Sequence, residues 1–436
     1  MNAPSRPAPP PPAPRPANKT DARHNGPVRI LVAPDKFKGT LSARAAADAI
    51  AEGARRAAAA AATEIEIDLC PLSDGGEGFV DVLKTNAGGA AGGAAVGVST
   101  RRTRAHGPFN EIVDAEWLLA TSQPATAYLE MASVAGLALV PEARRDPMRA
   151  TTAGLADLIR AAAQARARRI VIGLGGSATV DGGVGMAGAL GARFFDERGG
   201  LLPASASALE RIARIELPKT YAHFSGIEFI GACDVDNPLC GGNGAARVYA
   251  PQKGATPAQV ERLEAGLLNL ARCCRMAGLP GQGDVPGAGA AGGMGFGLMA
   301  FLGARLERGI GLVMFARGFS TRLAAADLVI TGEGRLDEQS LRGKVVAGVA
   351  RAAAGRDVPC LALAGEIAGE KEALLKAFDR EGAPIADAAA LTDLASSRED
   401  AVKRARELVA AAAAELVGRY LRDAEAEPGS LRFRIA

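Results

Sequence analysis

The stretch "VIGLGGSATVDGGVGMAGALG", residues 171–191, decides the fold. It continues an apolar, β-branched run at 169–172, which favours a buried strand. Glycine then dominates, and Asp181 is the only charged residue of the stretch. A helical pattern begins only at Val184. We therefore predict a strand, a wide glycine loop and then a helix.

The same order of strand, loop and helix returns along most of the chain. This alternation, with apolar strands, is typical of an α/β fold built on a parallel sheet. We predict Ser42 and Thr256 as helix N-caps. Strands are expected over 28–34, 63–71, 226–238 and 358–367, helices over 42–61, 151–165, 200–215, 256–278 and 397–424, and a further strand, loop and helix over 325–354.

The middle of the chain has a different pattern. Residues 94–131 alternate in short segments, which indicates a meander of strands. The strand expected over 226–238 ends in two acids, Asp234 and Asp236. We therefore expect a second domain of mixed α/β type.

The composition excludes several classes of protein. The chain has 436 residues and a net charge of +3. The proline-rich segment 1–27 carries this whole charge and is expected to be a disordered tail without a secretory signal. The rest of the chain is formally neutral, so we expect no nucleic-acid partner.

Neither a membrane span nor a cysteine-based site is expected. Residues 285–304 are uncharged, but proline and glycine fill their first half, so we expect a loop that leads into a buried helix. The six cysteines lack the spacing of a zinc site or a disulfide framework. We therefore expect a cytoplasmic protein without a membrane partner.

Chemically reactive side chains gather where the expected strands end. They lie in the segments 33–40, 72–79, 173–183, 232–241 and 331–340. Because ligands bind at the carboxyl ends of strands in open α/β sheets, we expect these loops to face one cleft. Lys36 and Lys38 stand out in a chain that prefers arginine, and a lysine can follow a phosphate as a compact charge.

Carboxylates form the largest group among these side chains. Mg²⁺ prefers carboxylate and water oxygens, and a kinase needs one carboxylate near the hydroxyl group that it phosphorylates. An aspartate beside glycine is also ordinary turn chemistry, so the set matters more than any one member. The set comprises Asp74, Glu77, Asp181, Asp234, Asp236, Glu333 and Asp337.

The glycine loop admits two interpretations. Residues 173–178 match the dinucleotide fingerprint, which would favour an NAD-dependent dehydrogenase. Against this, a dinucleotide site needs a helix that begins near the second glycine, and residues 181–183 would break such a helix near its start. A wider loop that holds phosphate with backbone N–H groups fits better. A nucleotide-binding regulator without catalytic activity is a third class.

Seven longer segments together resemble the glycerate kinase family, in the same order. They are "APDKFKGTLSA", "PLSDGGEGF", "GLGGSATVDGGVGMAGALG", "CDVDNPLCG", "YAPQKGA", "GAAGGMGFGLMAFLGARLERGI" and "VITGEGRLDEQSLRGKV". The resemblance covers residues 28–417. It implies phosphorylation of D-glycerate with ATP and Mg²⁺, usually giving 2-phosphoglycerate; transfer to the 3-hydroxyl, giving 3-phosphoglycerate, is the alternative.

The resemblance also implies two α/β domains around a cleft. One is Rossmann-like with a parallel sheet, and the other is an inserted domain of mixed α/β type. We expect the tail at 1–27, the Rossmann-like domain at 28–92 plus 285–436, and the inserted domain at 93–284. The partner is a small molecule, and a homodimer is left open.

Residue roles are our own inference from these motifs. Lys36, Asp74 and Asp181 are expected to be catalytic, and Asp74 and Asp181 also to hold the metal. Glycerate is expected to contact Asp35, Lys38, Ser73 and Asp234. Phosphate or ATP is expected at Gly175, Gly176, Ser177, Thr179, Gly293, Glu333 and Arg335.

Overall fold

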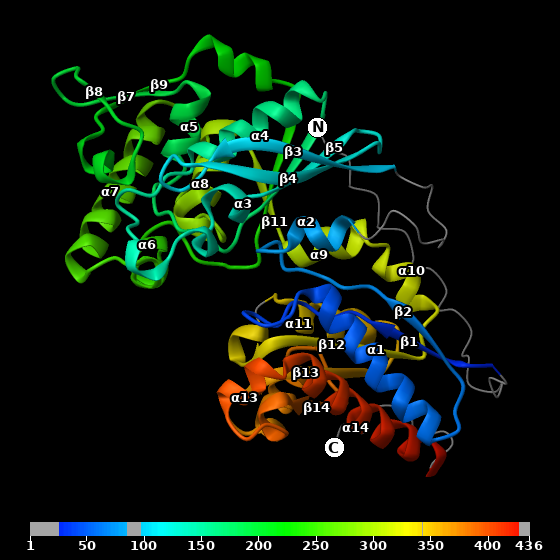
Figure 1. The fold of residues 1–436 in the computed structure, drawn as a ribbon. Helices are drawn as coiled ribbons and strands as arrows, with labels where there is room; N and C mark the ends of the chain where they lie inside the picture. Colours follow the sequence, from blue (N-terminus) through cyan, green and yellow to red (C-terminus); the bar gives the residue numbers. More distant parts are fainter. Residues whose placement is uncertain (1–25, 85–96, 342, 427–436) are drawn as a thin grey trace, which may run out of the picture.

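The computed structural model describes residues 26–84, 97–341 and 343–426. Two lobes lie one above the other, each built around a central sheet (Figure 1). The expectation for the proline-rich tail concerns residues 1–25 almost entirely, and these lie outside the described residues. The α/β class predicted from the sequence is confirmed.

The lower lobe contains a five-stranded sheet in which every neighbouring pair is parallel. The strands lie in the order β2-β1-β12-β13-β14, which along the chain is second, first, third, fourth and fifth. This doubly wound order has its switch point between β1 and β12. The bounds are β1 Val28–Val32, β2 Ile65–Leu69, β12 Leu328–Leu336, β13 Cys360–Ile367 and β14 Asp387–Ala390.

Successive side chains of a buried strand point to opposite faces of the sheet, and helices cover both faces. Ile30 and Val32 pack in one core with α1 (Ala43–Ala60) and α14 (Ala405–Ala426), whereas Leu31 packs in the core that contains α11 (Val345–Ala354). Gly53 lets α1 approach α14, because a Cβ there would collide with the carbonyl oxygen of Ala410. The predicted Ser42 cap is confirmed: its side chain accepts from the backbone of Ala45 at 3.2 Å.

The upper lobe contains the mixed sheet. Its order is β11-β10-β6-β5-β4-β3, antiparallel from β3 to β5 and parallel from β5 to β11. The meander expected at 94–131 is therefore present as β3, β4 and β5. The bounds are β3 Val98–His106, β4 Ile112–Ala120, β5 Thr126–Glu130, β6 Arg169–Gly173, β10 Glu228–Ala232 and β11 Arg305–Glu307.

Four helices share the hydrophobic core beside the upper sheet. They are α4 (Ala153–Gln164), α5 (Val184–Leu190), α7 (Pro257–Met276) and α8 (Ala290–Leu302). The helix expected from Val184 is α5, and the Thr256 cap expected for α7 is part of a capping box. The apolar stretch 285–304 enters the buried helix α8, as predicted. Among the described residues, no helix is long and apolar enough to cross a membrane.

Three helices lie between the two sheets: α2 (Phe79–Lys84), α9 (Gly309–Ala316) and α10 (Phe319–Ala324) (Figure 1). Their apolar side chains join residues of both sheets, such as Leu31 and Val171, in one continuous core. Residues 290–307 pack with the upper sheet as α8 and β11, although we expected them with the Rossmann-like domain. The domain limits themselves stay a prediction.

The helix expected over 200–215 was wrong. Leu202 pairs with Phe194 in a small sheet, and Ile215 pairs with the same residue from the other side. Only the 3₁₀ turn Ala206–Arg211 (η3) lies between them, since Pro203 interrupts the helical pattern. The sheet consists of β7 Arg193–Phe195, β8 Leu201–Leu202 and β9 Arg214–Glu216.

The remaining elements are short connecting helices and turns. They are α3 Ala132–Ala135, η1 Leu137–Leu139, η2 Glu142–Arg144, η4 Lys219–Phe224, α6 Ala245–Tyr249, η5 Pro251–Lys253, η6 Glu338–Leu341, α12 Lys371–Arg380, η7 Leu391–Asp393 and α13 Arg398–Lys403.

Candidate functional site

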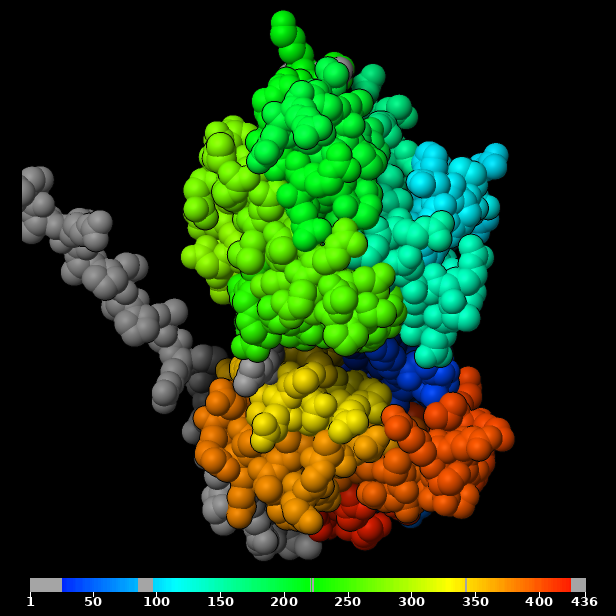
Figure 2. Space-filling model, turned by 90° about the vertical axis from the view of Figure 1, so that its left-hand side faces the viewer, coloured from blue at the N-terminus to red at the C-terminus, as the bar shows by residue number. Residues whose placement is uncertain are grey.

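The loops at the strand ends meet at the junction of the two lobes. In the space-filling view a constriction separates the green upper lobe from the yellow, orange and red lower lobe, and dark blue N-terminal residues show within it (Figure 2). A Cβ on Gly173 would stand 2.5 Å from the carbonyl oxygen of Gly75, and one on Gly175 would stand 2.6 Å from Gly76 Cα. Glycine is therefore required because the backbones of these two loops touch.

The switch point of the lower sheet supplies two acidic side chains. Asp35 follows β1, and its N–H donates to the carbonyl oxygen of Gly332 on β12 at 2.8 Å. Glu333 lies within β12, near the carboxyl end of that strand. Both side chains are buried, at 7% and 5% exposure. The predicted convergence of loops at the carboxyl ends of the strands is thus seen at β1 and β12.

Four carboxyl groups form what we call the acid cluster: Asp35, Asp74, Asp234 and Glu333. Burial, and then the charge of Asp74, raises the pKa of Asp35 to about 8 and that of Asp234 to about 8. Burial also raises the pKa of Glu333 to about 7, although the Lys344 ammonium opposes this shift. Because the charge of Asp74 opposes ionisation of the other three carboxyl groups, a bound cation would favour their charged forms.

Two oxygens of the acid cluster are buried without a protein partner. Asp234 Oδ2 accepts from the N–H of Ile310 at 2.9 Å, but Asp234 Oδ1 accepts from nothing among the described residues. Glu333 Oε1 is likewise unpartnered. Within the described residues, no group of three acids, histidines or cysteines stands at metal-binding distances. The free oxygens suit Mg²⁺, which takes one or two carboxylates and completes its shell with phosphate and water.

Cationic side chains border the acid cluster. Lys36 Nζ donates to the carbonyl oxygen of Glu77 at 2.6 Å, which holds it beside the 72–79 loop. Lys344 Nζ lies 4.0 Å from Glu333 Oε2 and 3.9 Å from Asp337 Oδ1. Sequence reasoning missed Lys344, although it is another lysine in an arginine-rich chain and lies in the quoted "LRGKV" segment.

Arg308 is a second missed residue. Its guanidinium grips both oxygens of Asp236, at 2.8 and 3.1 Å, and donates to the carbonyl oxygen of Asp234 at 3.1 Å. It therefore fixes the loop that carries one member of the acid cluster. Nothing in the sequence pairs these residues, because they are far apart along the chain.

Asp181 requires a correction. Its side chain is fully buried, at 0% exposure. Its oxygens accept from Thr152 N and Oγ1 at 3.0 and 2.9 Å, and from the N–H groups of Gly183 and Gly185 at 3.0 and 3.2 Å. Because the side chain is enclosed and both oxygens accept from protein donors, the structure contradicts the expected roles as catalytic base and metal ligand. Asp181 joins the first turns of α4 and α5.

The phosphate cradle is smaller than expected. Ser177 and Thr179 are buried, and Lys253 Nζ donates to Ser177 Oγ at 2.8 Å and to the Thr179 carbonyl oxygen at 2.7 Å. The Ser177 hydroxyl group is therefore occupied by Lys253, whereas Thr179 Oγ1 is buried without a partner among the described residues. Gly175 and Gly176 lie nearer the surface, and within the described chain neither of their N–H groups donates a hydrogen bond. These two amides remain available for phosphate.

Three other expected contacts are also placed by the structure. Gly293 is buried in the core of the upper lobe, where a Cβ would stand 2.8 Å from Leu239 Cδ1, so its assignment to ATP is corrected. Ser73 is 1% exposed, and its Oγ accepts from the Gly75 N–H at 3.3 Å, so it shapes the turn rather than contacting a substrate. Arg335 is exposed and lies 3.5 Å from Asp337.

Glu130 is a buried acid that sequence reasoning did not select. Its two oxygens accept from the N–H groups of Gly78 and Val80 at 3.0 and 3.1 Å. Burial raises the pKa of this carboxyl group. Glu130 thereby ties the 72–79 loop to β5 of the upper lobe, a link that only the fold creates.

The loop does not have the geometry of a dinucleotide site. The helix after the glycine fingerprint begins at Val184, beyond Asp181, and not at the second glycine. The dehydrogenase interpretation needs that helix N-terminus against the pyrophosphate. The observed geometry therefore favours the phosphate-loop interpretation.

Comparisons with a family model, with curated sequences and with a solved structure all point to one family. The model of the glycerate kinase family matches residues 30–421. The chain is 40% identical to a glycerate kinase of Halalkalibacterium halodurans (80% of this chain, 88% of the relative) and to the glycerate 2-kinase of Escherichia coli K12 (78% and 86%). A crystal structure of a protein assigned as glycerate kinase 2 from Salmonella typhimurium LT2 superposes with a TM-score of 0.72 at 37% identity, covering 92% of this chain and all of that one.

Proposed function

The chain belongs to the glycerate kinase family and is an enzyme of that class, and from this premise we propose that it transfers the terminal phosphoryl group of ATP to D-glycerate. The observation that carries the proposal is the acid cluster at the lobe junction, bordered by Lys36 and Lys344. Phosphoryl transfer requires a metal-binding acid, a cation for the phosphate and a carboxylate near the hydroxyl group, and this junction offers all three.

In the proposed reaction, Asp74 accepts the proton of the attacking hydroxyl group. The hydroxyl oxygen forms the new bond to the terminal phosphorus, the bond from that phosphorus to the bridging oxygen breaks, and ADP leaves. Asp74 takes this role because it is partly exposed at the cleft, whereas Asp35 and Asp181 are buried.

The remaining groups bind and orient the reactants. Lys36 neutralises the transferred phosphoryl group, and Lys344 pairs with Glu333 at 4.0 Å. The N–H groups of Gly175 and Gly176 hold phosphate oxygens. Asp234 and Glu333 would hold Mg²⁺ through their unpartnered oxygens. The bound metal would supply charge neutralisation on the phosphate oxygens.

We propose 2-phosphoglycerate as the product. Support comes from the Escherichia coli relative, which is named glycerate 2-kinase. Transfer to the 3-hydroxyl is the alternative, because the choice depends on the placement of the reacting atoms within a fraction of an ångström. A cytoplasmic location, the magnesium requirement and a homodimer stay predictions.

An ADP-release assay tests the proposal. Purified protein with ATP, Mg²⁺ and D-glycerate should release ADP, and omission of glycerate should abolish the signal. Phosphorus NMR of the product should show 2-phosphoglycerate; a 3-phosphoglycerate signal would contradict the regiochemistry. Reduction of NAD without ADP release would contradict the kinase itself.

A further inference from the structure

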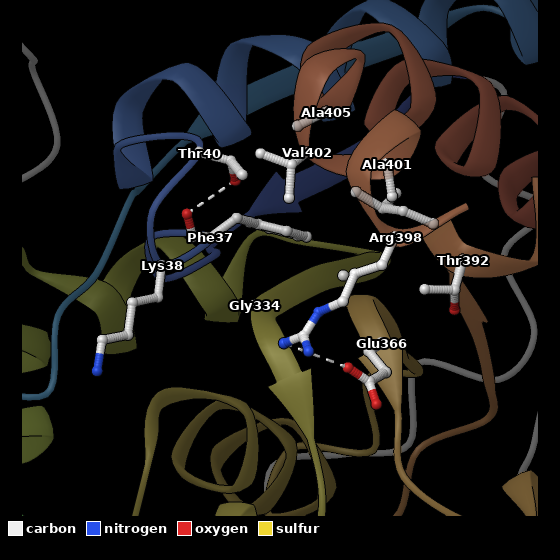
Figure 3. Close-up of a pocket in the computed structure, with 12 residues that line it drawn as sticks. Phe37, Lys38, Thr40, Gly334, Glu366, Thr392, Arg398, Ala401, Val402 and Ala405 are labelled. Carbon is white, nitrogen blue, oxygen red and sulfur yellow. Dashed lines mark hydrogen bonds and ion pairs between the residues drawn. The ribbon is translucent and has the colours of Figure 1, made fainter. Parts of the chain in front are cut away.

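A separate pocket lies beside the acid cluster, at the carboxyl edge of the lower sheet. It holds about 100 Å³ and opens between the β1–α1 loop, the ends of β12 and β13, and helices α13 and α14 (Figure 3). Nothing in the proposed chemistry uses it so far. Its position next to the switch point is where open α/β sheets bind nucleotides and related ligands.

The lining is apolar inside and polar at its rim. Phe37, Leu391 and Val402 supply apolar surface from three different elements. Arg398 reaches across the opening toward Glu366, at 3.9 Å (Figure 3). Apolar walls with a few polar groups are typical of sites for flat organic rings.

Two glycines keep the backbones at the pocket close together. A Cβ on Gly334 would stand 2.9 Å from Lys38 N, and one on Gly365 would stand 2.5 Å from the Gly334 carbonyl oxygen. A side chain at either position would force the strand ends apart. The glycines therefore preserve the space that the pocket occupies.

The pocket and the acid cluster are built from the same two segments. Asp35 and Lys36 belong to the site at the lobe junction, and Phe37 and Lys38 line the pocket directly after them. In the same way Glu333 belongs to the cluster, and the next residue lines the pocket. Because successive strand residues point to opposite faces of a sheet, the two regions lie on opposite faces and meet at the carboxyl edge, and a ligand with an anionic end and an apolar end would pass around that edge to reach both.

Lys38 stands at the boundary between these two regions. Its ammonium group extends away from the rim residue Thr392 (Figure 3). Among the described residues, nothing accepts a hydrogen bond from it. The charge is thus free to meet an anionic group that leaves the pocket.

We propose that this pocket receives the base of the nucleoside triphosphate and that Lys38 binds the adjoining phosphates, an inference that rests on the proposed kinase function. Five apolar side chains suit a heterocycle better than glycerate, which carries a polar group on every carbon. The pocket volume of about 100 Å³ is smaller than the cavity of about 150 Å³ that accommodates benzene, so the pocket would enclose only part of the ring system of a base. Lys38, first expected to contact glycerate, is reassigned to the nucleotide.

The test compares two ligands that differ only in the nucleoside part. Isothermal titration calorimetry would measure binding of ADP and of inorganic tripolyphosphate. Val402→Trp, on the half-exposed wall of the pocket, should weaken ADP about tenfold or more and change tripolyphosphate less than about twofold. Lys403→Trp, the next residue, which points to solvent, is the matched control and should change neither affinity.

A second variant keeps the test decisive if the tryptophan disturbs folding. Arg398→Ala removes a side chain that is 82% exposed, and so should leave the melting temperature unchanged. It should weaken ADP about threefold or more through loss of stacking, again without affecting tripolyphosphate. Lys38→Met should weaken both ligands.

The outcomes separate this inference from the proposed function. ADP affinity equal to wild type in both Val402→Trp and Arg398→Ala would overturn the pocket assignment even if glycerate is phosphorylated. Equal losses for ADP and tripolyphosphate would overturn it too, because the pocket would then serve phosphate alone. Selective loss of ADP supports the pocket, including in a protein that proves unable to phosphorylate glycerate.

Discussion

The ammonium nitrogen of Lys253 lies 2.8 Å from Ser177 Oγ, inside the upper lobe. It also donates to the carbonyl oxygen of Thr179, and only 3% of the residue is exposed. The buried amino group of Lys253 thus holds in place the segment that directly follows the glycine loop at 175–176. This contact fixes a loop in which the N–H groups of Gly175 and Gly176 donate to no described residue, and it places a titratable group inside the protein.

Lys253 should make stability depend on pH. Burial lowers its pKa to about 7, against about 10.4 for a lysine in an unfolded chain. Between these values the unfolded state binds more protons than the folded state, so the contribution of Lys253 to stability rises as pH increases from about 7 to about 10. The melting temperature of wild type, measured relative to that of Lys253→Met, should therefore be higher at pH 9.5 than at pH 6.5.

The control for this comparison is Lys403→Met, which removes an exposed lysine. Its melting temperature should stay parallel to that of wild type across the same range. A constant difference between wild type and Lys253→Met would show that the buried lysine keeps its ordinary pKa.

Asp181→Asn should damage stability rather than chemistry. An amide offers one acceptor oxygen and places its NH₂ group against backbone donors such as Gly183 and Gly185 N–H. An unsatisfied buried group of this kind costs about 1–3 kcal/mol in the free energy of unfolding. Urea unfolding should show this loss, while kcat per folded molecule should stay within a few-fold of wild type.

Asp74→Asn provides the contrast. Its side chain is partly exposed at the cleft, where one oxygen accepts from the Gly76 N–H at 3.0 Å. We expect kcat to fall about a hundredfold or more, as when a preorganised charge is removed, with little change in unfolding. The reverse pattern, with activity lost at Asp181 and kept at Asp74, would restore the role that the sequence suggested.

The sequence predicted well what local patterns determine. The loops at the ends of β1, β2, β6 and β12, and the onset of α5 at Val184, follow from apolar periodicity and glycine placement. Burial could not be predicted, because Asp181 beside glycine has the same local pattern as Asp74 beside glycine. Which of them faces the cleft depends on whether α4 and α5 enclose it.

Partners far apart in the chain were equally beyond local reasoning. Arg308 holds Asp236, and Lys253 holds Ser177, only because the fold brings their segments together. The scarcity of lysine was a usable signal at Lys36 and Lys38, and it would also have selected Lys253 and Lys344. A preference for loops directly after strands excluded these two.

Magnesium should stabilise the protein more at high pH than at low pH. The raised pKa values of Asp35, Asp234 and Glu333 mean that the folded state keeps protons up to about pH 7–8, which the unfolded chain releases near pH 4. Their contribution to stability is therefore complete at low pH and is lost as pH rises from about 4 to about 8. A divalent cation offsets this loss only once the protons have left.

Thermal melting with EDTA or with saturating Mg²⁺, at pH 5.5 and 8.5, measures the effect. The gain from Mg²⁺ should be larger at pH 8.5, and Asp234→Asn should reduce it. An equal gain at both pH values would mean that the metal binds away from these carboxyl groups.

Lys36→Met should reduce kcat about a hundredfold or more with little change in melting temperature. The methionine keeps the apolar stem and removes the ammonium group, which in the described part of the chain donates one hydrogen bond, to the Glu77 carbonyl oxygen, at a partly exposed position. If Lys36 neutralises the transferred phosphoryl group, its effect is confined to the transition state, and such a charge is worth a factor of this size. Lys36→Arg should recover only part of the rate, because a rigid guanidinium fork follows a moving phosphate less well than an ammonium group. Lys376→Met, on the distant helix α12, is the matched control and should keep wild-type kcat. Near-normal kcat in Lys36→Met would exclude this residue from the transfer step and leave Lys344 as the cation beside the acid cluster.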